Sequence, residues 1–215
     1  MHASFKLAAA FALAAFTIAA LAAESVTARQ IVDRIQRETK LSWDKPTVDT
    51  FKAGDPDAPV QGIAVVMMST FEVLQRASAA GANFIITHEP TFYDHHDSVV
   101  ALEKENDAVL AAKQAFIREH GLVIWRFHDH PHEMQPDMID VGVIRALDWE
   151  RYQKNPDVPK FVFPETTLAE FAARIKTQLG IRTLRVVGDP KLKITTAGLS
   201  PGFSGFAANR RLLQA

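Results

Sequence analysis

The chain of 215 residues contains no cysteine. This absence excludes a disulfide framework, a thiol nucleophile and the attachment of a lipid to an N-terminal cysteine. Any metal site in this protein must therefore use nitrogen and oxygen ligands.

Several other signatures of function are also missing. The sequence has no glycine-rich phosphate loop, no Gly-x-Ser-x-Gly nucleophile motif, no internal repeat and no basic run. Its formal net charge is -1, so we expect no nucleic-acid partner. With 47% hydrophobic residues, the length suits one or two globular domains with a packed core.

Residues 1–23 differ from the rest of the chain. Lys6 precedes a run from Leu7 to Ala23 that is apolar except for Thr17, and Ala20-Leu21-Ala22 provides a small-x-small cleavage site before Glu24. This pattern predicts a signal peptide, hence an exported protein, periplasmic or secreted, with no stable membrane association after cleavage. The alternative is an uncleaved membrane anchor, for which the run is short and rich in alanine rather than leucine.

The following segments alternate between helix and strand patterns. Capping boxes at Thr27–Gln30 and Ser69–Glu72 mark two helix starts. Expected helices cover residues 27–40, 69–81 and 106–119, expected strands cover residues 63–68, 83–87 and 122–127, and residues 44–59 are expected to form a loop. Because the strands are continuously apolar, we expect an α/β fold with a mainly parallel sheet and helices on both faces.

The pattern changes near residue 155. Expected strands at residues 160–163, 182–187 and 192–199 surround a helix at residues 167–180. We therefore divide the chain into the signal peptide, an α/β metal-binding domain at residues 24–154, and a second, smaller β-α-β-β segment at residues 155–215. No closing element is evident after residue 199.

Two expected strands end in polar clusters. His88-Glu89 follows the first, and His128-Asp129-His130-Pro131-His132 follows the second. Carboxyl ends of parallel strands share one edge of a sheet, so the two clusters should lie together. In an extended segment His128, His130 and His132 would project to one side and Asp129 to the other. Imidazoles at this density favour a metal site, although a solvated polar loop is the alternative.

Two further stretches are less specific. Residues 93–97 form a third polar cluster, either orienting metal ligands or exposed as a loop. We assign His96 to the loop and leave His95 open. The glycine-bearing turn at residues 200–205 is a weak candidate for approaching a substrate.

Four stretches resemble a known family. Residues 81–90, GANFIITHEP, resemble the strand and His-His-Pro motif of the Nif-three-like dinuclear-metal proteins, some of which are described as GTP cyclohydrolase one, type two. Residues 127–132 resemble the family's second metal motif, and residues 186–190 and 198–202 resemble its strand and loop signatures. The likeness spans residues 60–205. It implies an α/β fold with two divalent metal ions and assembly into toroidal hexamers.

The same resemblance implies a ligand set. His88 matches the first histidine of the motif, and Glu89 replaces the second while keeping a ligand type. The family's later aspartate position falls by spacing on His132, with Asp129 nearby as a substitute, and His128 completes the expected ligands. Asp129 or His130 would orient a ligand or act as a general base. The expected cofactor is a divalent ion of Zn, Fe, Mn, Ni or Co, with two ions implied.

Two functions follow from these expectations. The first is a metal-dependent hydrolase of an unknown small-molecule substrate, working as a homo-oligomer. Opening of a GTP ring is an analogy only, since an exported protein would rarely meet GTP. The second is a non-catalytic metal-binding or assembly protein. The family's late His and Glu motif does not occur before Ala215, which implies a fragment or an incomplete site.

Overall fold

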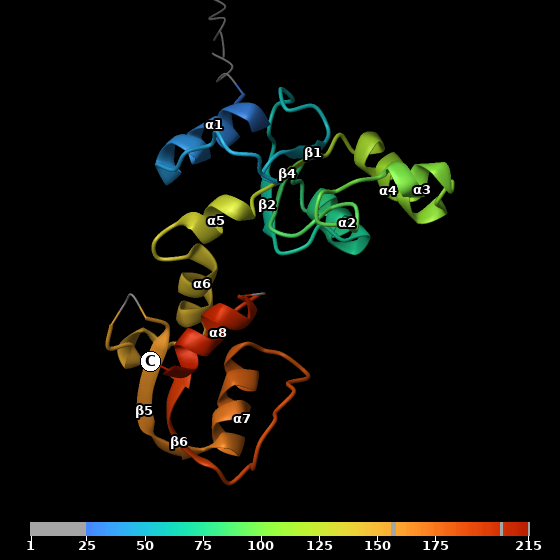
Figure 1. Ribbon diagram of the computed structural model, residues 1–215. Helices are drawn as coiled ribbons and strands as arrows, with labels where there is room; N and C mark the ends of the chain where they lie inside the picture. Colours follow the sequence, from blue (N-terminus) through green and yellow to red (C-terminus); the bar gives the residue numbers. More distant parts are fainter. Residues whose placement is uncertain (1–24, 156–157, 203, 215) are drawn as a thin grey trace, which may run out of the picture.

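The computed structural model describes residues 25–155, 158–202 and 204–214 (Figure 1). The expected signal peptide at residues 1–23 lies outside the described residues. Among the residues that are described, no helix combines the length and apolar character needed to cross a membrane.

A four-stranded sheet forms the centre of the first part of the chain. Its order is β1 (Phe51–Ala53), β4 (Val123–Arg126), β3 (Phe84–Thr87) and β2 (Ile63–Val66). Strands β2, β3 and β4 are parallel, while β1 runs antiparallel to β4. Strand β1 lies within residues 44–59, which we expected to be a loop, so that expectation is wrong at those three residues.

Strands β3 and β4 are buried on both faces. Phe84 and Trp125 pack with α1 (Ala28–Thr39) on one face. Ile85 and Ile124 pack with α2 (Phe71–Ala79) and α4 (Ala108–Glu119) on the other. The continuous apolar strands thus have helices on each side, which confirms the α/β expectation. A short helix, α3 (Val100–Lys104), precedes α4.

The helix starts agree only in part with the expected capping boxes. Thr27 and Gln30 form the expected reciprocal pair at α1. At α2 the N-cap is Thr70, whose side chain accepts from the Val73 N–H. Ser69 is buried instead and its hydroxyl bonds to that of Thr91 at 3.0 Å, so the box expected to begin at Ser69 is wrong. The hydroxyl of Thr70 can cap the helix in place of Ser69, because either residue type is favourable at an N-cap.

Two helices lead from the sheet to the C-terminal part, α5 (Asp129–Glu133) and α6 (Met138–Ala146) (Figure 1). A short 3₁₀ turn, Glu150–Tyr152, follows. Strands β5 (Lys160–Thr167) and β6 (Lys193–Gly198) then form an antiparallel pair with α7 (Leu168–Gln178) and α8 (Gly205–Gln214).

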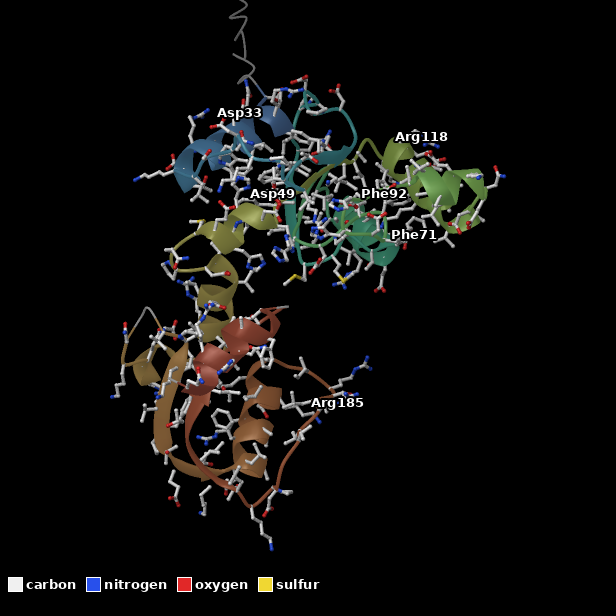
Figure 2. The ribbon with its side chains drawn as sticks, in the orientation of Figure 1. Asp33, Asp49, Phe71, Phe92, Arg118 and Arg185 are labelled. Atoms are coloured by element: carbon white, nitrogen blue, oxygen red, sulfur yellow. The ribbon has the colours of Figure 1, made fainter. Side chains whose placement is uncertain are left out.

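The C-terminal unit is β-α-β rather than the expected β-α-β-β. Residues 182–187 form no strand. Val187 is 87% exposed, so this segment buries little apolar surface that could stabilise it as a strand. Figure 2 shows Arg185 on this outer segment. Helix α8 closes the unit, which the sequence did not indicate. A Cβ added at Gly198 would lie 2.7 Å from Leu212, so glycine permits this close approach of α8 to β6.

Candidate metal site

Three histidines meet beyond the ends of β3 and β4. Because Thr87 pairs with Arg126 in the parallel register, His88 and His128 emerge side by side. Their ring centroids lie 4.6 Å apart, and His132 lies 5.1 Å from His88 and 5.2 Å from His128. One ligand atom from each ring lies within 4.8 Å of the others. The structure therefore brings together three of the four expected metal ligands.

Each of the three rings has one nitrogen directed at an oxygen. Nδ1 of His88 lies 3.2 Å from the Phe127 carbonyl, that of His128 lies 2.9 Å from the Asp129 carboxylate, and that of His132 lies 2.7 Å from the Asp137 carboxylate. With Nδ1 donating, Nε2 carries the free lone pair. Such oxygen partners are how proteins orient histidines that bind metal.

The spacing of the rings suits one ion. Nitrogen ligands lie about 2.0–2.1 Å from zinc, so rings in tetrahedral positions would have centroids roughly 5 Å apart. The observed separations of 4.6, 5.1 and 5.2 Å agree with this. Three imidazoles at this spacing therefore fit a divalent transition metal in both chemistry and geometry.

Electrostatics favour the protonation states that binding requires. Burial lowers the pKa of His88, and the neighbouring His128 lowers it further, which favours the neutral ring. Burial would raise the pKa of Asp129, but hydrogen bonds from His128, Thr47 and the Val48 N–H outweigh it and lower the pKa to about 2. Asp129 is therefore a carboxylate, able to hold His128 in one orientation.

Asp49 determines the conformation of the histidine-rich segment. Its buried carboxylate accepts from the N–H groups of His128 at 2.6 Å, Asp129 at 2.9 Å and His130 at 2.9 Å. These are the free N–H groups that begin α5, and Figure 2 shows Asp49 beside that end of the helix. Pro131 is tolerated because it lies in the first turn, where no intrahelical N–H bond is lost.

The helical turn corrects the expected extended geometry. Residues four apart share a face of a helix, so His128 and His132 point to the same side. His130 points away from them. Its ring stacks on Trp43 at 3.4 Å, and its nitrogens face Asp49 at 2.7 Å and the Ser42 carbonyl at 3.3 Å.

The remaining expected site residues lie around the cluster without joining it. Asp129 supports His128, whereas His130 is only 3% exposed; a catalytic role for either stays a prediction. The Glu89 side chain is 39% exposed and lies 3.9 Å from the guanidinium of Arg126. Glu89 is thus near the three histidines but outside their converging group.

Asp49, Asp137 and Arg126 support the site but were not found from the sequence. Asp137 caps α6 through the Ile139 N–H while it orients His132. The sequence did contain a signal for Asp137, because this residue lies five positions after His132 and directly before a helix. Asp49 and Arg126 carry no local signal, because their partners are distant in the chain.

A cavity of about 690 Å³ opens beside the cluster. Pro201, Gly202 and Ser204 line it from the C-terminal unit, so the turn singled out in the sequence does face the histidines. Asp140 also lines it, and burial followed by the nearby Asp137 raises the pKa of its carboxyl group. The cavity therefore brings the three histidines together with a carboxyl group that retains its proton more readily than usual.

The fold and the histidines define a class, an α/β protein with a candidate metal centre at the carboxyl edge of its sheet. Residues 27–119 match the family Duf34/NIF3 (NGG1p interacting factor 3). This matched range includes the motif at residues 81–90, and it confirms the resemblance to the family.

Individual relatives are distant. A GTP cyclohydrolase 1 type 2 homolog of Clostridium acetobutylicum is 25% identical over 152 residues, covering 66% of this chain and 54% of the relative. This chain thus spans about half the length of that curated relative.

Solved structures share the fold. A hypothetical protein of Staphylococcus aureus has a TM-score of 0.65 at 18% identity, covering 89% of this chain and 76% of its own. A Bacillus cereus protein related to NIF3 has a TM-score of 0.63 at 12% identity, covering 81% and 76%. At these identities the likeness establishes the shared architecture alone.

Proposed function

We propose that this protein binds a divalent transition-metal ion through Nε2 of His88, His128 and His132. The observation that carries the proposal is the convergence of three imidazoles whose Nδ1 atoms each face an oxygen partner. Among the expected metals, Zn, Fe, Ni and Co suit imidazole better than Mn does. One ion suits this cluster, and a second, implied by the resemblance, would require further ligands.

We further propose that the site supports hydrolysis of a small molecule. A bound ion of this kind lowers the pKa of a water molecule and polarises a carbonyl or phosphoryl oxygen. Three protein ligands are typical of catalytic zinc sites, which keep a position open. The adjacent cavity of about 690 Å³ is in the size range of small-molecule sites, and Asp140 is placed to donate a proton there. The name of the Clostridium relative supports a hydrolytic reaction class, but GTP itself is not proposed.

A non-catalytic metal-binding protein is the second candidate. The observation in its favour is the accessibility of one ligand, since the His132 side chain is 36% exposed. An exposed ligand allows an ion to be loaded and released without any reaction on a substrate.

Metal binding by His88→Ala tests the first proposal. Zinc analysis and competition titration should give about one ion per wild-type chain, and the variant should lose roughly tenfold to a hundredfold or more in affinity. His120→Ala is the matched control, because His120 lies at the end of α4 against Phe116. Circular dichroism checks folding. Equal zinc affinity in the wild type and His88→Ala would refute the site.

Hydrolysis assays on the zinc-loaded protein separate the two candidates. Turnover of a phosphoester, amide or nucleotide substrate that disappears in His88→Ala supports the hydrolase. Stoichiometric zinc without turnover supports the non-catalytic protein.

We also propose export and self-association, on the signal pattern of residues 1–23 and the family resemblance. Mass spectrometry of exported protein should give an N-terminus near Glu24. Light scattering should give the mass of a homo-oligomer, and a hexamer is the state expected.

A further inference from the structure

A fourth histidine lies beside the cluster on a separate loop. The ring centroid of His95 is 5.7 Å from that of His128, with the planes at 79°, and His95 lines the same cavity. We propose that His95 is the fourth nitrogen ligand of the site at rest. This proposal depends on the three-histidine metal site proposed above.

The loop that carries His95 is held by two aspartates. Asp97 accepts from the N–H groups of Thr91 at 2.5 Å and Phe92 at 2.7 Å. Asp94 accepts from the N–H groups of His96 at 2.7 Å and Ser98 at 3.2 Å. These turns fix the backbone on both sides of His95. The loop therefore presents this side chain from a defined position.

The buried Arg126 joins this loop to the cluster. It is 0% exposed, and it donates from Nε to the His88 carbonyl at 3.1 Å and from a terminal nitrogen to the His95 carbonyl. Asp97 lies 3.5 Å from the guanidinium and balances its charge. A buried guanidinium is costly unless such partners stay in place. One side chain thus fixes the backbones of His88 and His95 relative to each other.

The His95 ring is available for coordination. Its nitrogens make no hydrogen bond to any described residue, whereas the Nδ1 atoms of the cluster all face oxygens. The side chain is exposed, so it can rotate toward the cluster. The rotation is needed, because His95 lies outside the group whose ligand atoms approach within 4.8 Å. Glu89, the other side chain expected as a ligand, lies 3.9 Å from Arg126 and outside that group.

A fourth protein ligand changes how the site would work. Zinc sites with four protein ligands are closed, whereas catalytic sites keep one position for water or substrate. With His95 in place a bound ion would be retained, and a substrate entering the cavity would have to displace this ring. His95 would then control access to the metal.

Variants of two adjacent histidines test this role. We expect His95→Ala to weaken zinc binding roughly tenfold or more, a loss at least as large as that for an outer partner of a ligand. It should also change the visible absorption spectrum of the cobalt-loaded protein, which reports the ligand set. His96→Ala is the matched control, since His96 is the neighbouring exposed histidine and does not line the cavity. It should leave both measurements unchanged.

The outcomes separate this inference from the proposed function. If His88→Ala weakens zinc binding but His95→Ala matches the wild type in affinity and cobalt spectrum, His95 is not a ligand and the three-histidine site stands. If His88→Ala also binds as the wild type does, both proposals fail. An equal effect of His95→Ala and His96→Ala would likewise overturn the specific role of His95.

Discussion

The site region, residues 25–137, and the C-terminal unit together with α6, residues 138–214, bury different kinds of side chain. In the site region Asp49, Lys113 and Arg126 are at most 3% exposed. The described core of the C-terminal unit is mainly aromatic, with Trp149 and Phe161 at its centre, and its buried polar residue is Thr166. Buried charges destabilise a fold unless each is paired, whereas buried rings stabilise it directly. Charge burial thus occurs where loop positions must be fixed around the histidines.

Asp49→Ala should give the largest effect, and it tests whether a buried charge holds the site region together. The change leaves three backbone N–H groups at α5 and Nδ1 of His130 without their acceptor. We expect a loss of about 3–5 kcal/mol in the free energy of unfolding, as for other broken buried pairs. Zinc affinity should fall with it, because His128 and His132 depend on that helix. Urea unfolding and zinc competition measure the two effects.

Phe161→Ala is the counterpart in the C-terminal unit. Removing this fully buried ring should cost about 3–5 kcal/mol by leaving a cavity. The three histidines lie outside its core, so zinc affinity should stay within roughly twofold of the wild type. Loss of zinc binding to the extent seen in Asp49→Ala would show that the two regions are not independent.

The convergence of His88 and His128 could be predicted because it depends on strand order alone. Continuous apolar strands indicate a parallel sheet, and a parallel sheet places the residues that follow its strands on one edge. The direction of His130 could not be predicted in this way. It depends on α5 being helical, and α5 begins on a carboxylate 79–81 residues earlier in the chain. A cap supplied from so far away leaves no pattern near the helix.

In the C-terminal unit the sequence predicted a strand that does not form. Residues 182–187 have the composition of a strand, yet no neighbouring strand or core covers them. The preference of a residue type for strands reflects how its side chain packs on a half-buried sheet. Such a preference therefore does not predict a strand where no sheet surface is available. Arg126 illustrates the same limit in the site region, because an arginine at a strand end reads as exposed until its distant acceptors are known.

The buried Lys113 should make the free energy of unfolding of the site region depend on pH. Burial lowers the pKa of Lys113 from 10.5 to about 8, partly offset by Asp97, although its ammonium group still bonds to the Thr91 carbonyl. Between these values the unfolded chain binds more protons, so the free energy of unfolding should rise with pH. Between pH 7.5 and 9.5 we expect a gain on the order of 2 kcal/mol that Lys113→Met lacks. Lys104→Met, at an exposed lysine, should retain the gain in urea unfolding.

The two capping boxes provide the smallest and most closely matched test. Thr27 begins α1 in the site region and Thr167 begins α7 in the C-terminal unit, each with reciprocal bonds to the third helical residue. Replacing either threonine with alanine should cost about 1 kcal/mol at pH 7. The reciprocal partners differ, because Gln30 is neutral whereas Glu170 is a carboxylate.

That difference predicts that only one of the two costs depends on pH. Hydrogen bonds from Thr167 and Thr166 lower the pKa of Glu170, so its contribution is present above the unfolded pKa and is lost as pH falls through the folded value. The cost of Thr167→Ala should therefore shrink between pH 7 and pH 3, while that of Thr27→Ala should not. Urea unfolding of both variants at the two pH values measures this. A cost of Thr167→Ala that does not change with pH would mean that the hydroxyl alone caps α7, and Thr167→Ala combined with Glu170→Gln would then behave as the single variant does.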